Sequence, residues 1–364
     1  MITVDALIAG PCPWPDGPGD AQGVILSSRV RLARSWSDYA FHRKLSRARQ
    51  QELTERLVDH LIAVLPDATP WHLARLTPLE RGALAERQAI SRELSAAKRP
   101  GAVVVEPGNG TLLAAMVNEE DHLRLQVIGS GLCLGHLLTK AITVDQDLAK
   151  RVTWSAHPRY GHLNACHTNL GTGLRASVML HLPALAETGE LKSILRACAK
   201  LHLAVRGQHG EGSEAAGHCY QISNARSLGH SEEDYLAVVL EAVQRVVAAE
   251  HLARAQLLTK ARTRLEDKVF RAWGMLTSAR RLSTEELLTE TSWLRLGVAL
   301  DVLGPHHWAI PTGLPADHRW RVLDRLALEA QPSHVQLLHA EGADLEPAVR
   351  DEVRADLVRR RLGV

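Results

Sequence analysis

The sequence predicts an α+β protein in which a larger domain of strands and helices is followed by a smaller helical domain. Short runs of β-branched and apolar residues alternate with segments of helical periodicity up to about residue 258. Helical patterns dominate the remainder of the chain. The length of 364 residues also suits two domains.

The first predicted elements follow an irregular lead-in at 1–23, because residues 10–23 (GPCPWPDGPGDAQG) are rich in proline and glycine. The segment VILSSRVRLARS, at 24–35, interleaves apolar residues with arginines and predicts a strand. Residues 50–65 and 79–94 carry apolar side chains at helical spacing and predict one helix each.

The later elements complete the larger domain. Residues 100–129 predict strands separated by turns at PGNG and NEED, and 176–185 predicts a strand that runs into a proline. Residues 232–258 predict a long amphipathic helix. The predicted domains are therefore 24–258 and a helical C-terminal domain at 259–364.

Composition narrows the function classes. A net charge of +2 gives no global field that would drive the chain onto nucleic acid or a membrane. Five cysteines without a CxxC pair argue against a disulfide framework or zinc site and favour a reducing compartment. The N-terminus lacks a basic region before an apolar run, and no apolar stretch is long enough to span a bilayer. We therefore expect a cytoplasmic protein that binds neither nucleic acid nor membrane.

Arginines cluster in the strand-like segment SSRVRLAR, which contains Arg29, Arg31 and Arg34. Alternation along a strand places Arg29 and Arg31 on one side, where two like charges repel unless an anion lies between them. A clamp for a polyphosphate is one interpretation. An exposed basic face is the alternative.

Two further segments combine residue types that suit phosphate chemistry. RGQHGEGSEA, at 206–215, places an arginine before three glycines whose backbone amides can approach phosphate, although a flexible surface loop explains it as well. NACHTNLGTGLRASV contains Cys166 and Arg175 around a turn of small residues. Cys166 is interpreted either as a thiol activated by arginines or as a small buried apolar residue.

The segment NEEDHLRLQ, at 118–126, places carboxylates between apolar runs. Because adjacent side chains alternate along a strand, Glu119 and Glu120 cannot both enter one pocket. A charged hairpin tip is the alternative. Arginines can hold a transferring phosphoryl group, and a carboxylate is needed where the acceptor must lose a proton. The combination indicates phosphoryl transfer to a basic acceptor.

These motifs resemble a known family. NEEDHLR, CxTNLGTGLRASV and QISNxxxLGxSE are similar to the ATP:guanidino phosphotransferases, which include creatine and arginine kinases, over roughly 24–255. The resemblance implies an antiparallel sheet flanked by helices and a helical C-terminal domain used for dimerisation. The early arginine motif and the additional C-terminal region resemble the bacterial branch that phosphorylates arginine in proteins.

The resemblance assigns roles to individual residues and implies ATP and Mg²⁺ as cofactors, without a metal site of the protein's own. Glu120 would hold and deprotonate the acceptor guanidinium, Cys166 would lie beside it, and Glu211 would be a second carboxylate. The residues expected to bind ATP are Ser27, Ser28, Arg29, Val30, Arg31, Gln88, Arg124, Arg175, Ala176, Ser177, Val178, Met179, Arg206, Gly207, Gln208, His209, Gly210 and Glu211.

RDEVRA, at 350–355, resembles a motif of that bacterial branch linked to phosphoarginine binding and allosteric activation, carried by Arg350, Asp351, Arg354 and Ala355. Arg350 and Arg354 stand four residues apart in an expected helix and would face the same way, as a phosphoryl ligand requires. A solvated helix end is the alternative.

The sequence departs from the family at three places. Gln88 stands where the family has a histidine, and it keeps hydrogen-bonding capacity but lacks a ring for stacking. His167 replaces the proline after the cysteine. Arg226 lies one place before the position of the arginine in creatine and arginine kinases, which is Ser227 here; bacterial relatives also tend to lack that arginine.

We therefore expect a protein arginine kinase with a role in stress response and protein quality control. A kinase for free arginine and a catalytically weakened phosphoarginine-binding adaptor are the alternatives. The resemblance implies a homodimer and, as partners, arginine-bearing protein substrates, an activator of the McsA type, a heat-shock repressor and a Clp-type chaperone.

Overall fold

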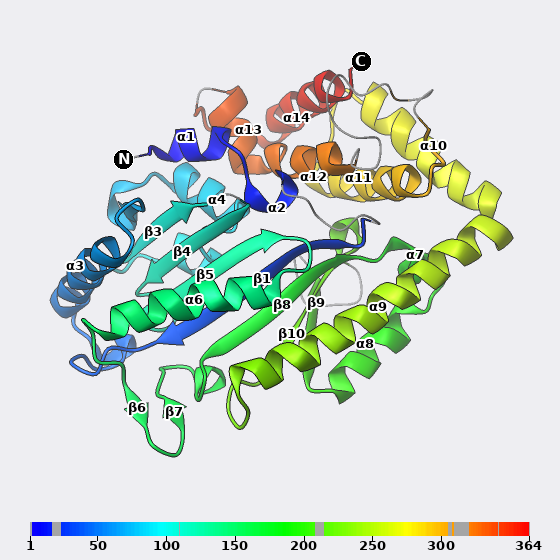
Figure 1. Cartoon of the computed structure of the whole chain (residues 1–364). Helices are drawn as coiled ribbons and strands as arrows, with labels where there is room; N and C mark the ends of the chain where they lie inside the picture. Colours follow the sequence, from blue (N-terminus) through cyan, green and yellow to red (C-terminus); the bar gives the residue numbers. More distant parts are fainter. Residues whose placement is uncertain are drawn as a thin grey trace. The chain divides into compact units, whose positions relative to one another are not determined.

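An eight-stranded sheet organises the structure, a computed structural model that describes residues 2–16, 23–108, 110–207, 215–304, 308, 320–340 and 342–363. The strand order is β2-β3-β4-β5-β1-β8-β10-β9 (Figure 1). The predicted antiparallel sheet flanked by helices is confirmed. Its strands are β1 Ile25–Arg34, β2 Thr69–His72, β3 Ala102–Pro107, β4 Thr111–Val117, β5 Leu123–Ser130, β8 Leu174–His181, β9 Leu203–Gly207 and β10 Cys219–Asn224; β6 Ala156–His157 and β7 Gly161–His162 form a separate hairpin.

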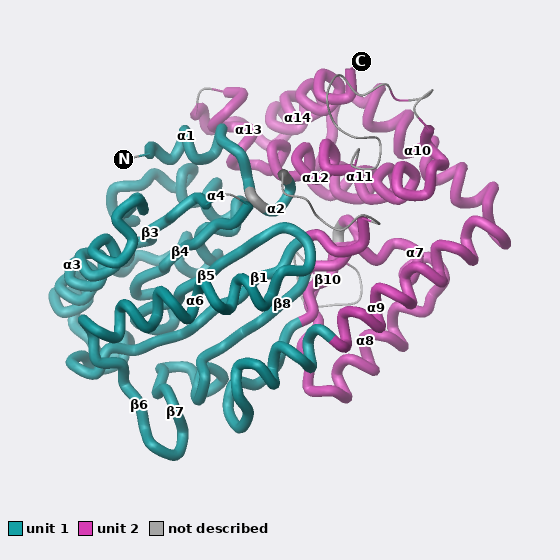
Figure 2. The backbone as a smooth tube through the Cα atoms, in the orientation of Figure 1, with its two compact units in different colours: residues 1–17, 27–178, 223–240 teal, residues 18–26, 179–222, 241–364 magenta. Residues whose placement is uncertain are grey.

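The chain forms two compact units (Figure 2). Unit 1 comprises 1–17, 27–178 and 223–240, and unit 2 comprises 18–26, 179–222 and 241–364. The helices of unit 1 are α1 Val4–Ala9, α2 Pro13–Asp16, α3 Arg47–Val64, α4 Pro78–Glu86, α5 Arg92–Ser95 and α6 Leu134–Ala149. Those of unit 2 are α7 Pro183–Glu187, α8 Leu191–Lys200, α10 Arg262–Ser278, α11 Thr284–Ala299, α12 Trp320–Glu329, α13 Pro332–His339 and α14 Pro347–Leu362, while α9 Glu232–Lys260 begins in unit 1 and ends in unit 2.

In unit 1, helices α3 and α6 lie against one face of the sheet (Figure 1). A Cβ atom at Gly129 of β5 would lie 2.9 Å from the Cys133 Sγ at the start of α6, so residue 129 faces these helices. Arg34 faces them too, because its Nη2 lies 2.7 Å from Asp145 Oδ2 on α6. Because successive side chains alternate between the two faces of a strand, Arg29 and Arg31 project from the sheet face opposite α3 and α6.

The predicted strands are present, and the helices predicted at 50–65 and 232–258 are confirmed by α3 and α9. The single helix predicted at 79–94 is wrong, because the chain breaks between α4 and α5. Gln88 adopts a left-handed conformation with φ 60°, which an α-helix does not allow. Ser91 then caps α5. Helical spacing alone did not reveal this interruption.

The lead-in predicted to be irregular contains two helices, so that prediction is wrong at Val4–Ala9 and Pro13–Asp16. The Thr3 side chain caps α1. The buried guanidinium of Arg87 donates hydrogen bonds to the carbonyl oxygens of Ile8, Gly10 and Pro11. Long-range bonds from this arginine therefore order a segment whose composition predicts a loop.

In unit 2, α11 lies against α10 and α12 and is buried along most of its length. Ser283 and Glu286 form a capping box at its start. Arg295 of α11 pairs with Asp324 of α12 at 2.7 Å. The predicted helical character of the C-terminal region is confirmed. The predicted domain boundary at 258/259 lies near the end of α9, just before α10 begins. The two compact units instead divide the chain within β1, β8, β10 and α9 and between residues 17 and 18. Among the described helices, none has the length and apolar character needed to cross a bilayer.

The motif RDEVRA lies on α14, and the structure separates its two arginines. Arg354 is fully buried. Its Nε lies 2.8 Å from the Ala330 carbonyl oxygen, and its Nη1 lies 2.7 Å from that of Leu282 and 2.5 Å from Asp351 Oδ1. Arg350 is only partly buried. Arg354 therefore holds the helices together, and the two side chains do not share one exposed face.

His122 ties the β4–β5 loop to the segment after β1. It is buried, its Nδ1 accepts the Trp36 N–H at 3.0 Å, and its Nε2–H donates to the Ala40 carbonyl oxygen at 3.0 Å. Burial, with a smaller contribution from His42, lowers its pKa from 6.5 to about 4. The imidazole is therefore neutral in the folded protein.

We predict that Arg354→Ala destabilises the protein by about 3 kcal/mol, because two buried carbonyl groups and a carboxylate lose their partner. Urea unfolding of the full chain measures this change. Arg360→Ala, an exposed position on the same helix, is the control and should alter stability by less than about 0.5 kcal/mol. Equal effects of the two substitutions would contradict the role of Arg354.

His122 predicts a pH dependence of stability. The unfolded chain binds a proton at this residue below pH 6.5, whereas the folded chain does so only near pH 4. The stabilisation is therefore fully present above pH 6.5 and is lost as the pH falls toward 4. In His122→Asn, unfolding free energy near pH 5 should depend on pH less steeply than in the wild type, by about 1.4 kcal/mol per pH unit. Identical slopes would contradict a neutral buried His122.

Candidate active site

Four arginines from three neighbouring strands gather in unit 1. Arg29 and Arg31 lie on β1, Arg124 on β5 and Arg175 on β8. The register pairs Arg31 with Gln126 and Ala33 with Arg124, so these side chains share the sheet face opposite α6. The predicted phosphate ligands of unit 1 are thus brought together.

The cluster is electrostatically unfavourable without an anion. Burial, followed by repulsion from Arg124 and Arg175, lowers the pKa of Arg29 to about 9. Burial and the other three arginines lower the pKa of Arg31 well below its usual range, and Glu119 opposes this only in part. The buried Nε atoms of Arg29 and Arg31 have no hydrogen-bond partner among the described residues. This arrangement fits a polyanion with several acceptor oxygens.

Glu119 anchors one member of this arginine cluster. Its side chain is buried, and its Oε1 lies 2.5 Å from Arg124 Nη1 and accepts the Ser91 hydroxyl at 2.6 Å. Burial raises the pKa of Glu119, but Arg124, Ser91 and the Glu120 N–H outweigh it, so the net pKa is lowered. Sequence reasoning left Glu119 without a role; the structure shows that it orients Arg124.

Gln88 lies beside the same sheet face. Its carbonyl oxygen accepts the Gln126 Nε2–H at 2.6 Å, and Gln126 neighbours Arg31 across the strand pair. The break between α4 and α5 therefore brings the predicted nucleotide-binding residue to the edge of the arginine cluster.

The structure also brings the predicted base and thiol segments together. The Glu120 side chain is exposed at the loop between β4 and β5. Asn169 Nδ2, from the segment that carries Cys166, lies 3.3 Å from Glu120 Oε2. The Cys166 Sγ lies 3.0 Å from the Thr168 hydroxyl oxygen and is partly exposed. An acceptor that reaches Glu120 therefore meets the segment that bears the thiol.

The segment 164–170, here called the thiol loop, is held by buried polar groups. Asp121 Oδ1 accepts the Ala165 N–H at 2.6 Å, and Asp121 Oδ2 accepts the Asn169 amide at 2.8 Å. The Ser227 hydroxyl lies 2.7 Å from the carbonyl oxygens of both Thr168 and Leu170. Ser227 thus contacts the thiol loop directly.

Two glycines allow the chain after the thiol loop to enter β8. Gly171 and Gly173 have φ values of +85° and +63°. A Cβ atom at Gly171 would lie 2.4 Å from the Ser227 carbonyl oxygen, and one at Gly173 would lie 2.6 Å from that of Ala33. Any larger residue would displace backbone on either side.

The remaining predicted ATP ligands occupy several environments. Ser28 and Val30 face α6, where the Ser28 hydroxyl donates to the Gly131 carbonyl oxygen at 2.7 Å. Ser27, Ala176, Ser177 and Val178 are buried in or beside the sheet. Met179, Arg206 and Gly207 belong to unit 2. Gln208, His209, Gly210 and Glu211 lie outside the described residues.

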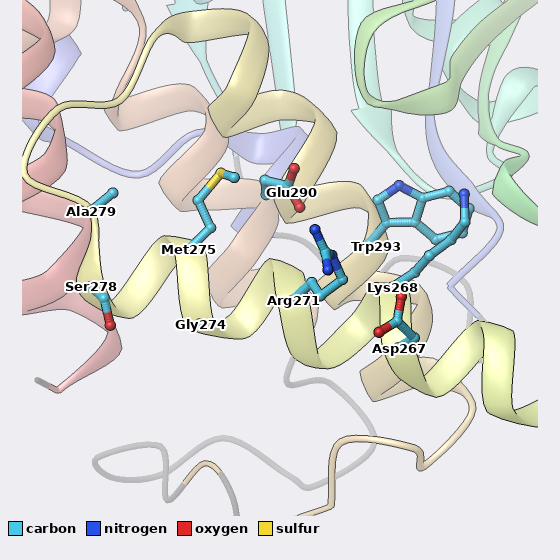
Figure 3. Close-up of a pocket in the computed structure, with 9 residues that line it drawn as sticks. All are labelled: Asp267, Lys268, Arg271, Gly274, Met275, Ser278, Ala279, Glu290 and Trp293. Carbon is cyan, nitrogen blue, oxygen red and sulfur yellow. The ribbon is translucent and has the colours of Figure 1, made fainter.

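A surface pocket of about 760 Å³ lies between α10 and α11 in unit 2 (Figure 3). Its charged lining mixes Lys268 and Arg271 with Asp267 and Glu290. Lys268 Nζ lies 2.8 Å from Glu187 and 4.2 Å from the centre of the Trp293 ring. This pocket therefore lacks the excess positive charge that distinguishes the arginine cluster.

Comparison with known proteins agrees with this geometry. The ATP:guanido phosphotransferase C-terminal catalytic domain matches residues 51–253, and the C-terminal domain of the protein-arginine kinase McsB matches 262–364. A protein-arginine kinase of Symbiobacterium thermophilum is 40% identical over 96% of each chain. One of Caldanaerobacter subterraneus is 36% identical over 93% of this chain and 97% of its own.

Solved structures support the same fold. A lombricine kinase superposes with a TM-score of 0.56 at 23% identity, covering 69% of this chain and 77% of its own. A taurocyamine kinase of Schistosoma mansoni gives 0.57 at 24% identity, covering 79% of this chain and 44% of its own. Together, the family matches and the nearly full-length relatives show that the chain belongs to the protein-arginine kinases of the ATP:guanido phosphotransferase family.

Proposed function

We propose that this protein transfers the γ-phosphoryl group of ATP to the guanidinium of arginine side chains in proteins. One observation carries the proposal: a cluster of four arginines on the sheet adjoins a loop whose solvent-exposed carboxylate contacts the segment that carries a thiol. The first feature suits a triphosphate donor and the second a cationic acceptor. The chain is similar to proteins that are named protein-arginine kinases, and that name describes a reaction of this kind.

The donor half of the site would hold ATP through its phosphates. Arg29, Arg31, Arg124 and Arg175 would surround the triphosphate and spread the charge that develops during transfer. Mg²⁺, where bound with ATP, would supply further positive charge to the phosphates beside these arginines. Gln88 would contact the nucleotide, and Arg206 with the following glycine-rich segment would complete the phosphate ligands.

The acceptor half must convert a guanidinium into a nucleophile. The pKa of an arginine side chain lies above about 12, so its nitrogen lone pair is unavailable while the group is protonated. Glu120 would orient the guanidinium and take one proton as the N–P bond forms and the bond from phosphorus to the ADP oxygen breaks. Cys166 would contact the guanidinium beside the reacting nitrogen, and Glu211 would supply a second carboxylate.

The C-terminal motif would add regulation. Arg350 is the partly exposed arginine of RDEVRA and would contact a phosphoryl group, while Asp351 would engage a guanidinium. Arg354 and Ala355 are buried and would shape this site from within. We also propose that the protein acts as a homodimer in the cytoplasm, in stress response and protein quality control. Its proposed partners are an McsA-type activator, a heat-shock repressor and a Clp-type chaperone.

We predict that Glu120→Gln lowers the rate of arginine phosphorylation at least about a hundredfold, because the amide cannot accept the proton. The dissociation constant for ATP should stay within about twofold, since Glu120 is not among the proposed phosphate ligands. Glu55→Gln, at an exposed position of α3, is the control for loss of surface charge. Parallel loss of ATP binding and transfer in Glu120→Gln would argue against Glu120 as the base.

Free arginine and arginine in a protein should differ as acceptors. With Mg²⁺ and ATP, we expect acid-labile phosphate on arginine residues of an unfolded protein substrate and little or none on free arginine. Mass spectrometry under neutral conditions measures both products in one reaction. If only free arginine were labelled, the proposal would be wrong and the protein would be a kinase for free arginine. Phosphoarginine binding without any transfer by the wild type would instead identify an adaptor.

A further inference from the structure

We infer that Asp121 and Asn169 are positioning residues that fix the carboxylate of Glu120 and the thiol of Cys166 in one geometry. The inference rests on the proposed function, which places both groups beside the acceptor. It assigns a role to the third carboxylate of NEEDH and to the asparagine of CHTNLG, neither of which is among the residues proposed above to contact the acceptor.

Asp121 fixes the backbone at the thiol. Its side chain is only 1% exposed. Its Oδ1 accepts the N–H of Ala165, the residue directly before Cys166, at 2.6 Å, and its Oδ2 accepts the Asn169 amide at 2.8 Å. A buried carboxylate is costly unless its oxygens are satisfied, so its presence here is explained by the bonds that it accepts. Because Ala165 is the residue directly before Cys166, the bond that holds the Ala165 N–H also restricts where the Sγ can lie.

Asn169 joins this buried carboxylate to the exposed one. Its Nδ2 lies 2.8 Å from Asp121 Oδ2 and 3.3 Å from Glu120 Oε2. An amide nitrogen carries two hydrogens, so one Nδ2 can serve both acceptors. Since both neighbours are carboxylate oxygens, the amide must present its nitrogen rather than its oxygen. Asn169 therefore limits the directions in which Glu120 can point.

The backbone of Asn169 is itself fixed from the other side. Asn164, which is buried, donates from Nδ2 to the Asn169 carbonyl oxygen at 2.6 Å and to the Ala33 carbonyl oxygen at 3.2 Å. Its Oδ1 accepts the Ser35 hydroxyl at 3.2 Å. The thiol loop is thereby attached to β1, so Asn169 meets Glu120 from a rigid support.

The donor half of the site has separate support. Glu119 holds Arg124 and Ser91, whereas the contacts of Asp121 lie in the thiol loop. Removing the link between Asp121 and Asn169 should therefore disturb the acceptor groups and leave the phosphate ligands in place. A residue that only stabilised the fold would affect both halves together.

The test compares Asn169→Ala with wild type in full-length protein. We expect kcat/KM for a protein substrate to fall about a hundredfold, as for a misplaced catalytic group, while the dissociation constant for ATP stays within about twofold. Alkylation of Cys166 by iodoacetamide, followed by peptide mapping, should change at least about fivefold in rate. Gln51→Ala, an exposed amide of α3, is the matched control and should change none of these quantities.

A pair of variants separates the two bonds of Asn169. Asp121→Asn should repeat the defect, because two amide nitrogens would then face each other. Adding Asn169→Asp restores a hydrogen bond with donor and acceptor exchanged, so thermal stability and the Cys166 alkylation rate should return toward wild type. The rate of phosphoryl transfer should stay low, since a carboxylate at position 169 cannot donate a hydrogen bond to Glu120.

Two outcomes would overturn the inference: wild-type transfer and alkylation in Asn169→Ala, or equal losses of transfer, ATP binding and thermal stability. Failure of the proposed function gives a different result from failure of this inference, because the wild-type protein would then phosphorylate no arginine. The Cys166 alkylation rates would still decide in that case whether Asp121 and Asn169 fix the thiol.

Discussion

The mutual repulsion of four arginines on one sheet face is the constraint on which the rest of unit 1 depends. Arg29, Arg31, Arg124 and Arg175 are brought together by strand register rather than by local sequence. Arg29 and Arg31 carry their charge where burial weakens solvent screening of the neighbouring arginines. The sheet has helices α3 and α6 on its other face, and Glu119 neutralises only part of the cluster. A triphosphate is the natural counter-charge for this surface.

The three successive carboxylates at 119–121 point to different surroundings, as a loop between two substrates of opposite charge would require. Glu119 is buried against Arg124 of the arginine cluster, whereas Glu120 is exposed to solvent. Asp121 is buried again and holds the thiol loop. His122 closes the loop through two hydrogen bonds and stays neutral, so it adds no charge to either half. Each of the four residues from Glu119 to His122 therefore has its own set of contacts.

Local patterns predicted the strands, the long helices and the residues that carry charge, because these depend on alternation and periodicity near each residue. The break at Gln88 and the helices of the lead-in depend instead on distant partners, Gln126 and Arg87. The roles of Asp121, Asn169 and Ser227 were missed for the same reason, since each acts through a contact across the fold. Arg354 resembles a ligand in sequence, but burial among carbonyl groups gives it a structural role.

We propose that the arginine cluster is held in a repulsive state that bound ATP relieves, and Arg29→Met tests this proposal most directly. All the charges that shift the pKa of Arg29 are repulsive, and methionine preserves much of its length without charge. Nucleotide-free protein should gain stability in urea unfolding, whereas ATP affinity measured by calorimetry should fall about a hundredfold. A variant that loses stability without ATP, or that binds ATP as tightly as wild type, would contradict the account.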